Sequence, residues 1–295
     1  MRFPQRQILL AWFLLISLVC GAGQQAIAEN IKPPEGLGVF YTGHSFHMFV
    51  PRQVEQLVKA AEIADHKLVG TQGIGGSKVI QHWNLEDSKN KAKAALKTGQ
   101  VDVFTMAAHL AIPDEGITRF TELGLEHNPD LRLLVQESWY PFDVADPEKR
   151  IRENSQRDAV KIEDLLPPMK EWRTKLEAQA DDLNKKHGKR AVFIVPVGDA
   201  VIKLRQMVVE GKFPGVTKQS ELFRDRIGHA NAHVQALATY CNFAAIYRTN
   251  PQGLNLPTKE ITHEQQGILQ KLAWDTVSQY PYSGVKASAK KVGAQ

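Results

Sequence analysis

The sequence is poor in cysteine, with Cys20 and Cys241 alone among its 295 residues. Cys20 belongs to an N-terminal segment that has the pattern of a cleaved signal peptide, which leaves a single cysteine in the mature chain. A protein with one cysteine has no internal disulfide, so we expect its stability to come from core packing. Cys241 lies in an apolar helical stretch and is predicted to be a buried packing residue.

Long apolar runs are also scarce. The one such run, Ile8 to Val19, follows two arginines and is too short for a comfortable membrane span. The small residues of a cleavage site follow at 26–28. We therefore predict a signal peptide over residues 1–28, a mature domain over 29–295 with no stable membrane insertion, and export to the periplasm or the exterior.

Signals for nucleic acid and for nucleotide cofactors are absent. The net charge is +5, but several of the basic residues lie in the C-terminal tail, and no aromatic-basic repeat indicates base stacking. No G-x-G-x-x-G opens a helix after the first predicted strand, so a dinucleotide fingerprint is missing. We therefore expect no nucleic-acid partner and no organic cofactor.

Apolar runs alternate with amphipathic stretches from residue 37 onward, a pattern typical of a parallel sheet with helices on both faces. The predicted strands are 37–42, 67–70, 101–106, 131–135 and 191–196, and the predicted helices include 54–63, 89–96, 117–125 and a last helix over 230–247. This order predicts a three-layer α/β/α sandwich with a flavodoxin-like, five-stranded parallel sheet.

The stretch from Asp146 to Lys189 interrupts this alternation. It is rich in charge, contains Pro167-Pro168 and shows helical patterning in its second half. Since a crossover between parallel strands needs only about a dozen residues, we predict a helical insertion here, acting as a flap or lid.

Three segments carry reactive groups at the expected carboxyl ends of the strands. Gly43-His44-Ser45-Phe46-His47 follows the first strand, where a serine at a helix N-terminus can favour an oxyanion, although the same serine could be a helix N-cap. The glycine-rich turn 73–77 follows the second strand and could cradle a ligand or be an ordinary flexible turn. Before the last predicted helix stand Asp225, His229 and His233, where an acid upstream of a histidine is typical of half a triad.

Taken together, these segments resemble the SGNH (GDSL-like) hydrolase family, over about residues 37–254 without the insertion. Gly43-His44-Ser45 is similar to the family's first block and 73–76 to its second. The tail, with Asn250-Pro251-Gln252-Gly253-Leu254 after the helix, resembles a bacterial exported branch.

The resemblance implies a serine esterase that hydrolyses an ester, such as an O-acyl group on a carbohydrate, without a cofactor. It implies that Ser45 is the nucleophile, His229 the base and Asp225 the residue that orients the base. The oxyanion hole would use backbone N–H groups of Ser45 and Gly76.

Two positions depart from the family pattern. Gly228 lengthens the acid-to-histidine spacing to D-x-x-x-H, which leaves His233 as a second candidate for the base. The third block has His109 after two alanines where the family has asparagine. Either His109 donates to the oxyanion, or the hole relies on the backbone alone; losing one such donor commonly costs about 10²–10³ in rate.

Substrate contacts are expected from residues beside this triad. His44 stands where the family has aspartate, and Gln136 and Trp139 follow the fourth predicted strand on the same rim. Trp139 could stack on a sugar ring or an acyl group, although tryptophan at such a place more commonly packs in the core.

Two alternatives remain open from the residues. Asp225, His229 and His233 are spaced i, i+4 and i+8, so they could share a helical face and bind zinc, with His44, His47 or His109 completing the shell. A carbohydrate-binding protein that has the fold without efficient catalysis would account for the missing asparagine.

Overall fold

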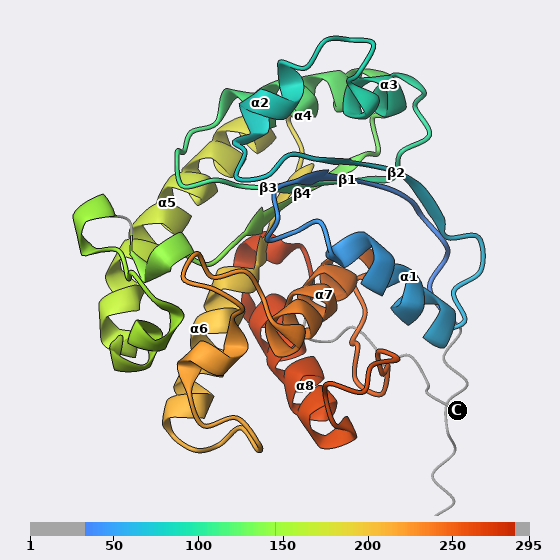
Figure 1. Cartoon of the computed structure of the whole chain (residues 1–295). Coiled ribbons are helices and arrows are strands. Elements are labelled where there is room, and N and C mark those ends of the chain that lie inside the picture. Colours follow the sequence, from blue (N-terminus) through green and yellow to red (C-terminus); the bar gives the residue numbers. More distant parts are fainter. Residues whose placement is uncertain (1–32, 145, 287–295) are drawn as a thin grey trace, which may run out of the picture. The chain divides into compact units, whose positions relative to one another are not determined.

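The computed structural model describes residues 33–144 and 146–286 and contains a five-stranded parallel sheet with the order β2-β1-β3-β4-β5. The strands are β1 (Gly38–Gly43), β2 (Lys67–Gly73), β3 (Val103–Ala107), β4 (Arg132–Glu137) and β5 (Val192–Pro196). Helices cover both faces of the sheet (Figure 1). The predicted three-layer sandwich with a flavodoxin-like sheet is thus confirmed.

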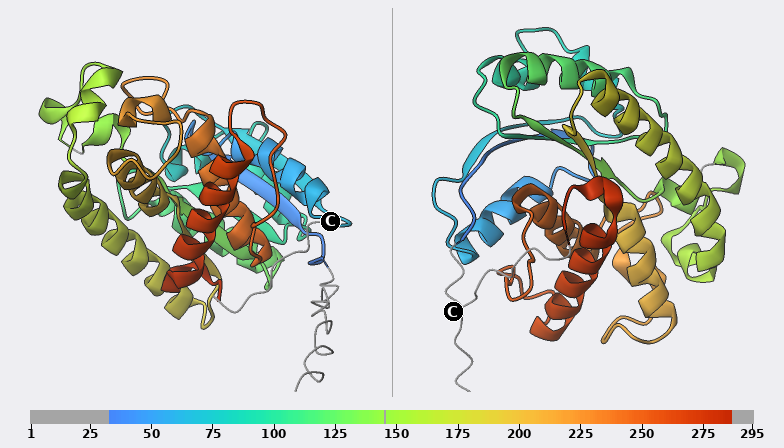
Figure 2. Two further views of the ribbon diagram at one scale, coloured as in Figure 1. Left: turned by 90° about the horizontal axis from the view of Figure 1, so that it is seen from below. Right: turned by 180° about the vertical axis from the view of Figure 1, so that it is seen from behind.

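The two outer layers contain different parts of the chain. One face is covered by α1 (Val50–Ala60), α6 (Val197–Val209), α7 (Ala232–Tyr247) and α8 (His263–Gln279), and the other by α2 (Val79–Trp83), α3 (Lys91–Lys97), α4 (Glu115–His127) and α5 (Ile162–Lys186) (Figures 1 and 2). Strands that are buried on both faces need apolar side chains at successive positions. This requirement explains why β1, β3 and β5 are fully buried and mostly apolar.

Helix α7 is buried nearly all round, including Cys241, whose predicted packing role is confirmed. The prediction that this helix is the last one is wrong, because α8 follows and packs against it. The sequence of α8 looks polar, but Gln265, Gln266 and Gln270 are buried. Gln266 accepts a hydrogen bond from the Tyr240 hydroxyl (2.7 Å), and Gln270 donates to the Leu254 carbonyl (2.7 Å).

Helix α5 occupies most of the stretch that was predicted to be an insertion. It packs Trp172, Leu176 and Leu183 into the core beside β5, so it is the crossover helix between β4 and β5. The additional structure therefore lies before it, in three short 3₁₀ segments: η1 (Pro141–Asp143), η2 (Pro147–Lys149) and η3 (Asn154–Ala159). A further 3₁₀ segment, η4 (Gln219–Leu222), precedes α7, and η5 (Pro281–Ser283) follows α8.

The predicted signal peptide over 1–28 lies outside the described residues. Among the residues that are described, none of the helices combines the length and the hydrophobicity needed to cross a membrane.

Candidate active site

Ser45, His229 and Asp225 form a continuous hydrogen-bonded chain. The Ser45 Oγ lies 2.9 Å from His229 Nε2, and His229 Nδ1 donates to Asp225 Oδ2 at 2.6 Å. The serine is exposed, and it follows β1, whereas the acid and the base lie in the loop before α7. At these distances a histidine can accept the proton of a serine hydroxyl while the carboxylate orients its ring.

The serine lies in a turn and not in a helix cap. His47 N and Met48 N both donate to the His44 carbonyl, and α1 begins only at Val50 with Phe49 as its N-cap. The N-cap interpretation of Ser45 is therefore wrong. Its turn starts where β1 lies close to β3: a Cβ on Gly43 would come within 2.7 Å of the Ala107 Cβ, so glycine is required there.

The acid is held by the backbone of its own loop. Asp225 Oδ1 accepts from the N–H groups of Gly228 (3.0 Å) and His229 (3.2 Å). Although partial burial acts in the opposite sense, the hydrogen bonds from His229 and Gly228 lower the pKa of Asp225, so the carboxylate stays ionised. Gly228 has a φ of +99°, and this left-handed conformation accommodates the additional residue of the D-x-x-x-H spacing.

His233 lies away from this chain of residues. Its ring packs edge-on against Phe213, with centroids 5.4 Å apart, and it does not line the pocket at Ser45. The proposed zinc shell of Asp225, His229 and His233 is therefore not brought together. No group of three or more histidine, cysteine, aspartate or glutamate side chains with metal-binding geometry is found within residues 33–144 and 146–286.

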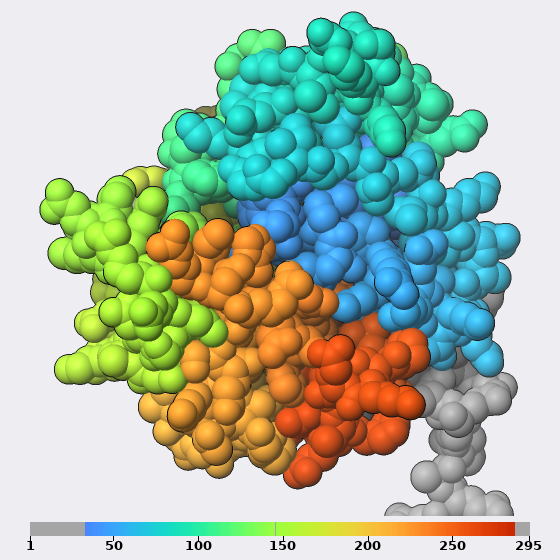
Figure 3. Space-filling model, viewed as in Figure 1, coloured from blue at the N-terminus to red at the C-terminus, as the bar shows by residue number. Residues whose placement is uncertain are grey.

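A pocket of about 460 Å³ adjoins Ser45 and His229. Most of its wall is apolar: Phe46, Leu110, Trp139, Pro141, Phe142, Trp172 and Ile227. The space-filling view shows the orange segment before α7 bordering the blue segment after β1, with cyan and green loops beside them (Figure 3). An apolar pocket with a few convergent polar groups is typical of a small-molecule site.

Backbone donors for an oxyanion come from two loops on this pocket. Neither Ser45 N–H nor Gly76 N–H donates to another group in the described part of the chain. Gly76 has a φ of +61°, and no atom lies within 4 Å of the position of its Cβ. The loop is anchored because Ile74 N donates to the Gly43 carbonyl and the Ser77 hydroxyl to the Ile74 carbonyl.

His44 and His109 also line this pocket, and burial lowers the pKa of both. His44 Nε2 bonds the Ala108 carbonyl (3.3 Å), its Nδ1 accepts from Phe46 N–H, and burial lowers its pKa to about 4. Burial also lowers the pKa of His109, whose Nδ1 has no partner among the described residues. Both histidines line the pocket, and their contacts with substrate and with the oxyanion stay predictions.

Gln136, in contrast, is corrected by the structure. It is fully buried at 0% exposure and does not line the pocket. Its amide donates to the Phe46 carbonyl (3.0 Å), and its carbonyl accepts from Asn242 (2.9 Å). The side chain of Gln136 thus supports the turn that carries Ser45 from within the protein. The reason is that β4 continues to Glu137, so Gln136 lies inside the strand and not on the rim beyond it.

Trp139 reaches the pocket but is mainly a packing residue. It is 4% exposed and stacks on Phe46 with ring centroids 4.5 Å apart and planes 8° apart. Its Nε1–H donates to the Gly228 carbonyl (2.8 Å). Substrate contact is therefore limited to the small part of the ring that is exposed.

His47 is a supporting residue whose role the sequence did not indicate. It is completely buried, its Nδ1 donates to Gln136 Oε1 (2.8 Å), and the Thr105 hydroxyl donates to its Nε2 (2.8 Å). Burial lowers its pKa to about 4. These two hydrogen bonds join the turn that carries Ser45 to β3 and β4.

We expect this buried histidine to make folding pH-dependent. Unfolded histidine binds a proton near pH 6.5, whereas folded His47 does so only near pH 4, so in this window the unfolded state holds more protons. The free energy of unfolding should therefore fall as the pH falls from 6.5 to 4, by about 3 kcal/mol from His47 alone. Urea denaturation at a series of pH values checks this. The slope should be smaller in His47→Gln, and equal slopes in the two proteins would contradict the prediction.

Comparison with protein-family models gives no match, and comparison with curated proteins gives none either. Among solved structures, the chain is similar to a DUF4886 family protein from Bacteroides uniformis, with 15% identity, a TM-score of 0.55, and coverage of 86% of this chain and 98% of that one. It is also similar to a proposed GDSL-like lipase from Parabacteroides merdae (13% identity, TM-score 0.41, coverage 72% and 99%). A third match is a proposed SGNH hydrolase from Slackia heliotrinireducens (12% identity, TM-score 0.44, coverage of 70% of this chain and 97% of that one). The likeness to the DUF4886 family protein shows a shared fold.

Proposed function

We propose that this chain is a serine esterase of the SGNH type. The observation that carries the proposal is the Ser45–His229–Asp225 chain, with 2.9 Å and 2.6 Å between its successive polar atoms, beside an apolar pocket. A structural serine or an isolated surface pair would not need all three groups in line next to a cavity. The order of these residues along the chain matches the resemblance of the sequence to this family.

In the proposed reaction, Ser45 Oγ attacks the acyl carbon of an ester while its proton moves to His229 Nε2. The negative charge on the former carbonyl oxygen is stabilised by N–H groups of Ser45 and Gly76, with the His109 ring as a further donor. The bond to the alcohol then breaks, and His229 protonates the leaving alcohol. Water, deprotonated by His229, hydrolyses the acyl-serine and releases the carboxylic acid. Asp225 orients and stabilises the imidazolium throughout.

The proposed substrate is an acyl ester, and an O-acyl group on a carbohydrate is the class we favour. The apolar wall suits an acyl chain, and the carbohydrate is proposed from the resemblance of the sequence to the family. Export to the periplasm or the exterior is part of the proposal, on the strength of the signal-peptide pattern over residues 1–28.

The proposal is tested with two reagents that do not require the natural substrate. The purified protein should hydrolyse p-nitrophenyl acetate, and a fluorophosphonate should form one adduct on the peptide that contains Ser45. Chelation with EDTA should leave the activity unchanged. Absence of both hydrolysis and labelling in folded protein would favour the non-catalytic carbohydrate-binding alternative, and activity lost on chelation would favour the zinc alternative.

A further inference from the structure

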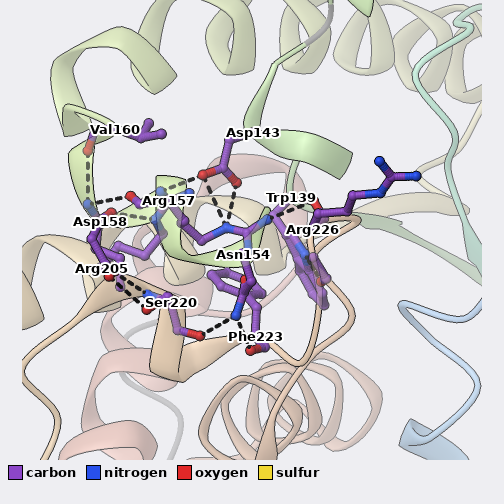
Figure 4. Close-up of polar contacts among 12 residues, drawn as sticks. Trp139, Asp143, Asn154, Arg157, Asp158, Val160, Arg205, Ser220, Phe223 and Arg226 are labelled. Atoms are coloured by element: carbon purple, nitrogen blue, oxygen red, sulfur yellow. Dashed lines mark hydrogen bonds and ion pairs between the residues drawn. The ribbon is translucent and has the colours of Figure 1, made fainter. Parts of the chain in front are cut away.

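The loop over residues 225–229, here called the base loop, is held by an unusual set of hydrogen bonds. Four consecutive carbonyls accept donors from the segment 139–157: Asp225 from Arg157 Nη1 (3.1 Å), Arg226 from Arg157 Nη2 (3.2 Å), Ile227 from Phe142 N (2.9 Å) and Gly228 from Trp139 Nε1 (2.8 Å). Arg157 and Trp139 approach the same stretch of backbone in the close-up (Figure 4). The base loop contains no helix or strand, and these four contacts hold it together with two hydrogen bonds of its own, from Gly228 N to the Asp225 carbonyl and from Arg224 N to the His229 carbonyl.

Arg157 is itself fixed in place. Its side chain is completely buried, and its Nε donates to both carboxylate oxygens of Asp143 at 3.1 and 3.2 Å. Its guanidinium lies over the Phe223 ring, 4.4 Å from the centroid, and also bonds the Asn154 side chain. Because the guanidinium is planar and rigid, fixing one nitrogen on Asp143 also fixes the two that reach the base loop.

Arg205 gives an internal comparison because it binds the same carboxylate. Its Nη2 donates to Asp143 Oδ2 (2.8 Å), but its Nε donates to Gln219 (2.7 Å), and it makes no hydrogen bond to the base loop. Both arginines are almost entirely buried. They therefore share the burial and the ion pair, and they differ in whether they contact the base loop.

The segment that carries these donors is conformationally costly. Phe142 and Asp143 have φ values of +56° and +61°, in the left-handed region that residues other than glycine rarely adopt. Such conformations are unfavourable and persist only where surrounding contacts require them. In this segment the same two residues make such contacts: Phe142 N–H donates a hydrogen bond to the Ile227 carbonyl, and the Asp143 carboxylate binds both arginines.

We infer that Arg157 is a positioning residue for proton transfer: with Trp139 and Phe142 it fixes the base loop and so holds His229 at hydrogen-bond distance from Ser45. The inference rests on the proposed function, in which His229 is the base. It assigns to the segment before α5 a role as a support for the catalytic base, in place of a lid. A displacement of about 1 Å in a reacting group can cost about 10²-fold in rate.

The test compares Arg157→Lys with Arg205→Lys in the full chain. Each lysine keeps a positive charge for Asp143, but a lysine at 157 has no fork with which to reach two carbonyls. For p-nitrophenyl acetate, we expect kcat of Arg157→Lys to fall about 10- to 100-fold with little change in KM, and kcat of Arg205→Lys to stay within about threefold. Equal losses in the two variants would overturn the inference, because a merely structural role affects both.

A second readout does not depend on turnover. The proton between His229 Nδ1 and Asp225 should give a far-downfield ¹H NMR signal in the wild-type protein and in Arg205→Lys, and it should broaden or vanish in Arg157→Lys. A sharp, unchanged signal in Arg157→Lys would refute the positioning role even if the protein is an esterase. Conversely, an inactive wild type with these same signal changes would refute the esterase and retain the positioning of the loop.

If Arg157→Lys does not fold, Trp139→Phe takes its place. It removes the Nε1–H donor to the Gly228 carbonyl and keeps an aromatic ring against Phe46. The expected result is the same fall in kcat and the same loss of the downfield signal. Wild-type values for both would overturn the inference.

Discussion

Replacing Ser45 with alanine is expected to reduce kcat for an activated ester by about 10⁴- to 10⁶-fold. The variant loses the nucleophile, and the remaining oxyanion donors and pocket cannot form an acyl-enzyme. Ser45 is exposed, and the hydrogen bond that its side chain makes is the one to His229, so the thermal melt should stay close to that of the wild type. Steady-state kinetics with p-nitrophenyl acetate and a thermal melt measure the two effects.

Ser278→Ala is a matched control, since Ser278 lies in α8 and does not line the pocket. It should keep wild-type turnover and fluorophosphonate labelling. Wild-type turnover in Ser45→Ala would place the nucleophile elsewhere and end the proposed mechanism. A large drop in melting temperature of that variant would instead show that the hydroxyl supports the fold.

His229→Gln should cause a loss of kcat comparable to that of Ser45→Ala, about 10⁴-fold or more, because no base then accepts the serine proton. His233→Gln, only four residues away, should retain nearly full activity because its ring packs on Phe213 away from the pocket. The pair of variants therefore separates the two histidines that the sequence left as candidates. The same kinetic assay measures both.

The comparison also addresses the metal alternative. A zinc shell of Asp225, His229 and His233 would make both histidine variants inactive and would deplete the protein of metal. An inactive His233→Gln variant with bound zinc lost would thus contradict the triad. An active His233→Gln variant together with an inactive His229→Gln variant would support the triad.

Much of the fold followed from local pattern. A buried parallel strand such as 191–196 is apolar at every position, so the strands of the sheet could be predicted. The amphipathic stretches between the strands likewise predicted most of the helices. Helix α8 could not be predicted, because its buried glutamines look like surface residues until their partners are known. Gln266 and Gln270 bond the Tyr240 hydroxyl in α7 and the backbone carbonyls of Leu256 and Leu254 in the loop between α7 and α8. The local sequence pattern of α8 does not report such pairing.

Some residues of the candidate site could likewise be predicted from local sequence, and others could not. Ser45, Gly76 and the Asp225/His229 pair were recognisable because each sits in a short motif at the end of a strand or before a helix. The position of Gln136 was predicted wrongly, because β4 continues two residues beyond the predicted end of the strand and Gln136 is a buried strand residue.

The sequence by itself determined the layer order and placed the candidate residues Ser45, Asp225, His229 and His233 along the chain, because apolar periodicity and short motifs are local properties. The tertiary structure alone decided that His229 and not His233 faces Ser45, that α5 is a crossover helix, and that Arg157 holds the base loop. These depend on contacts such as the one between Ser45 and His229, 184 positions apart. Their geometry is set by packing and by the satisfaction of buried polar groups, which no local stretch of sequence specifies.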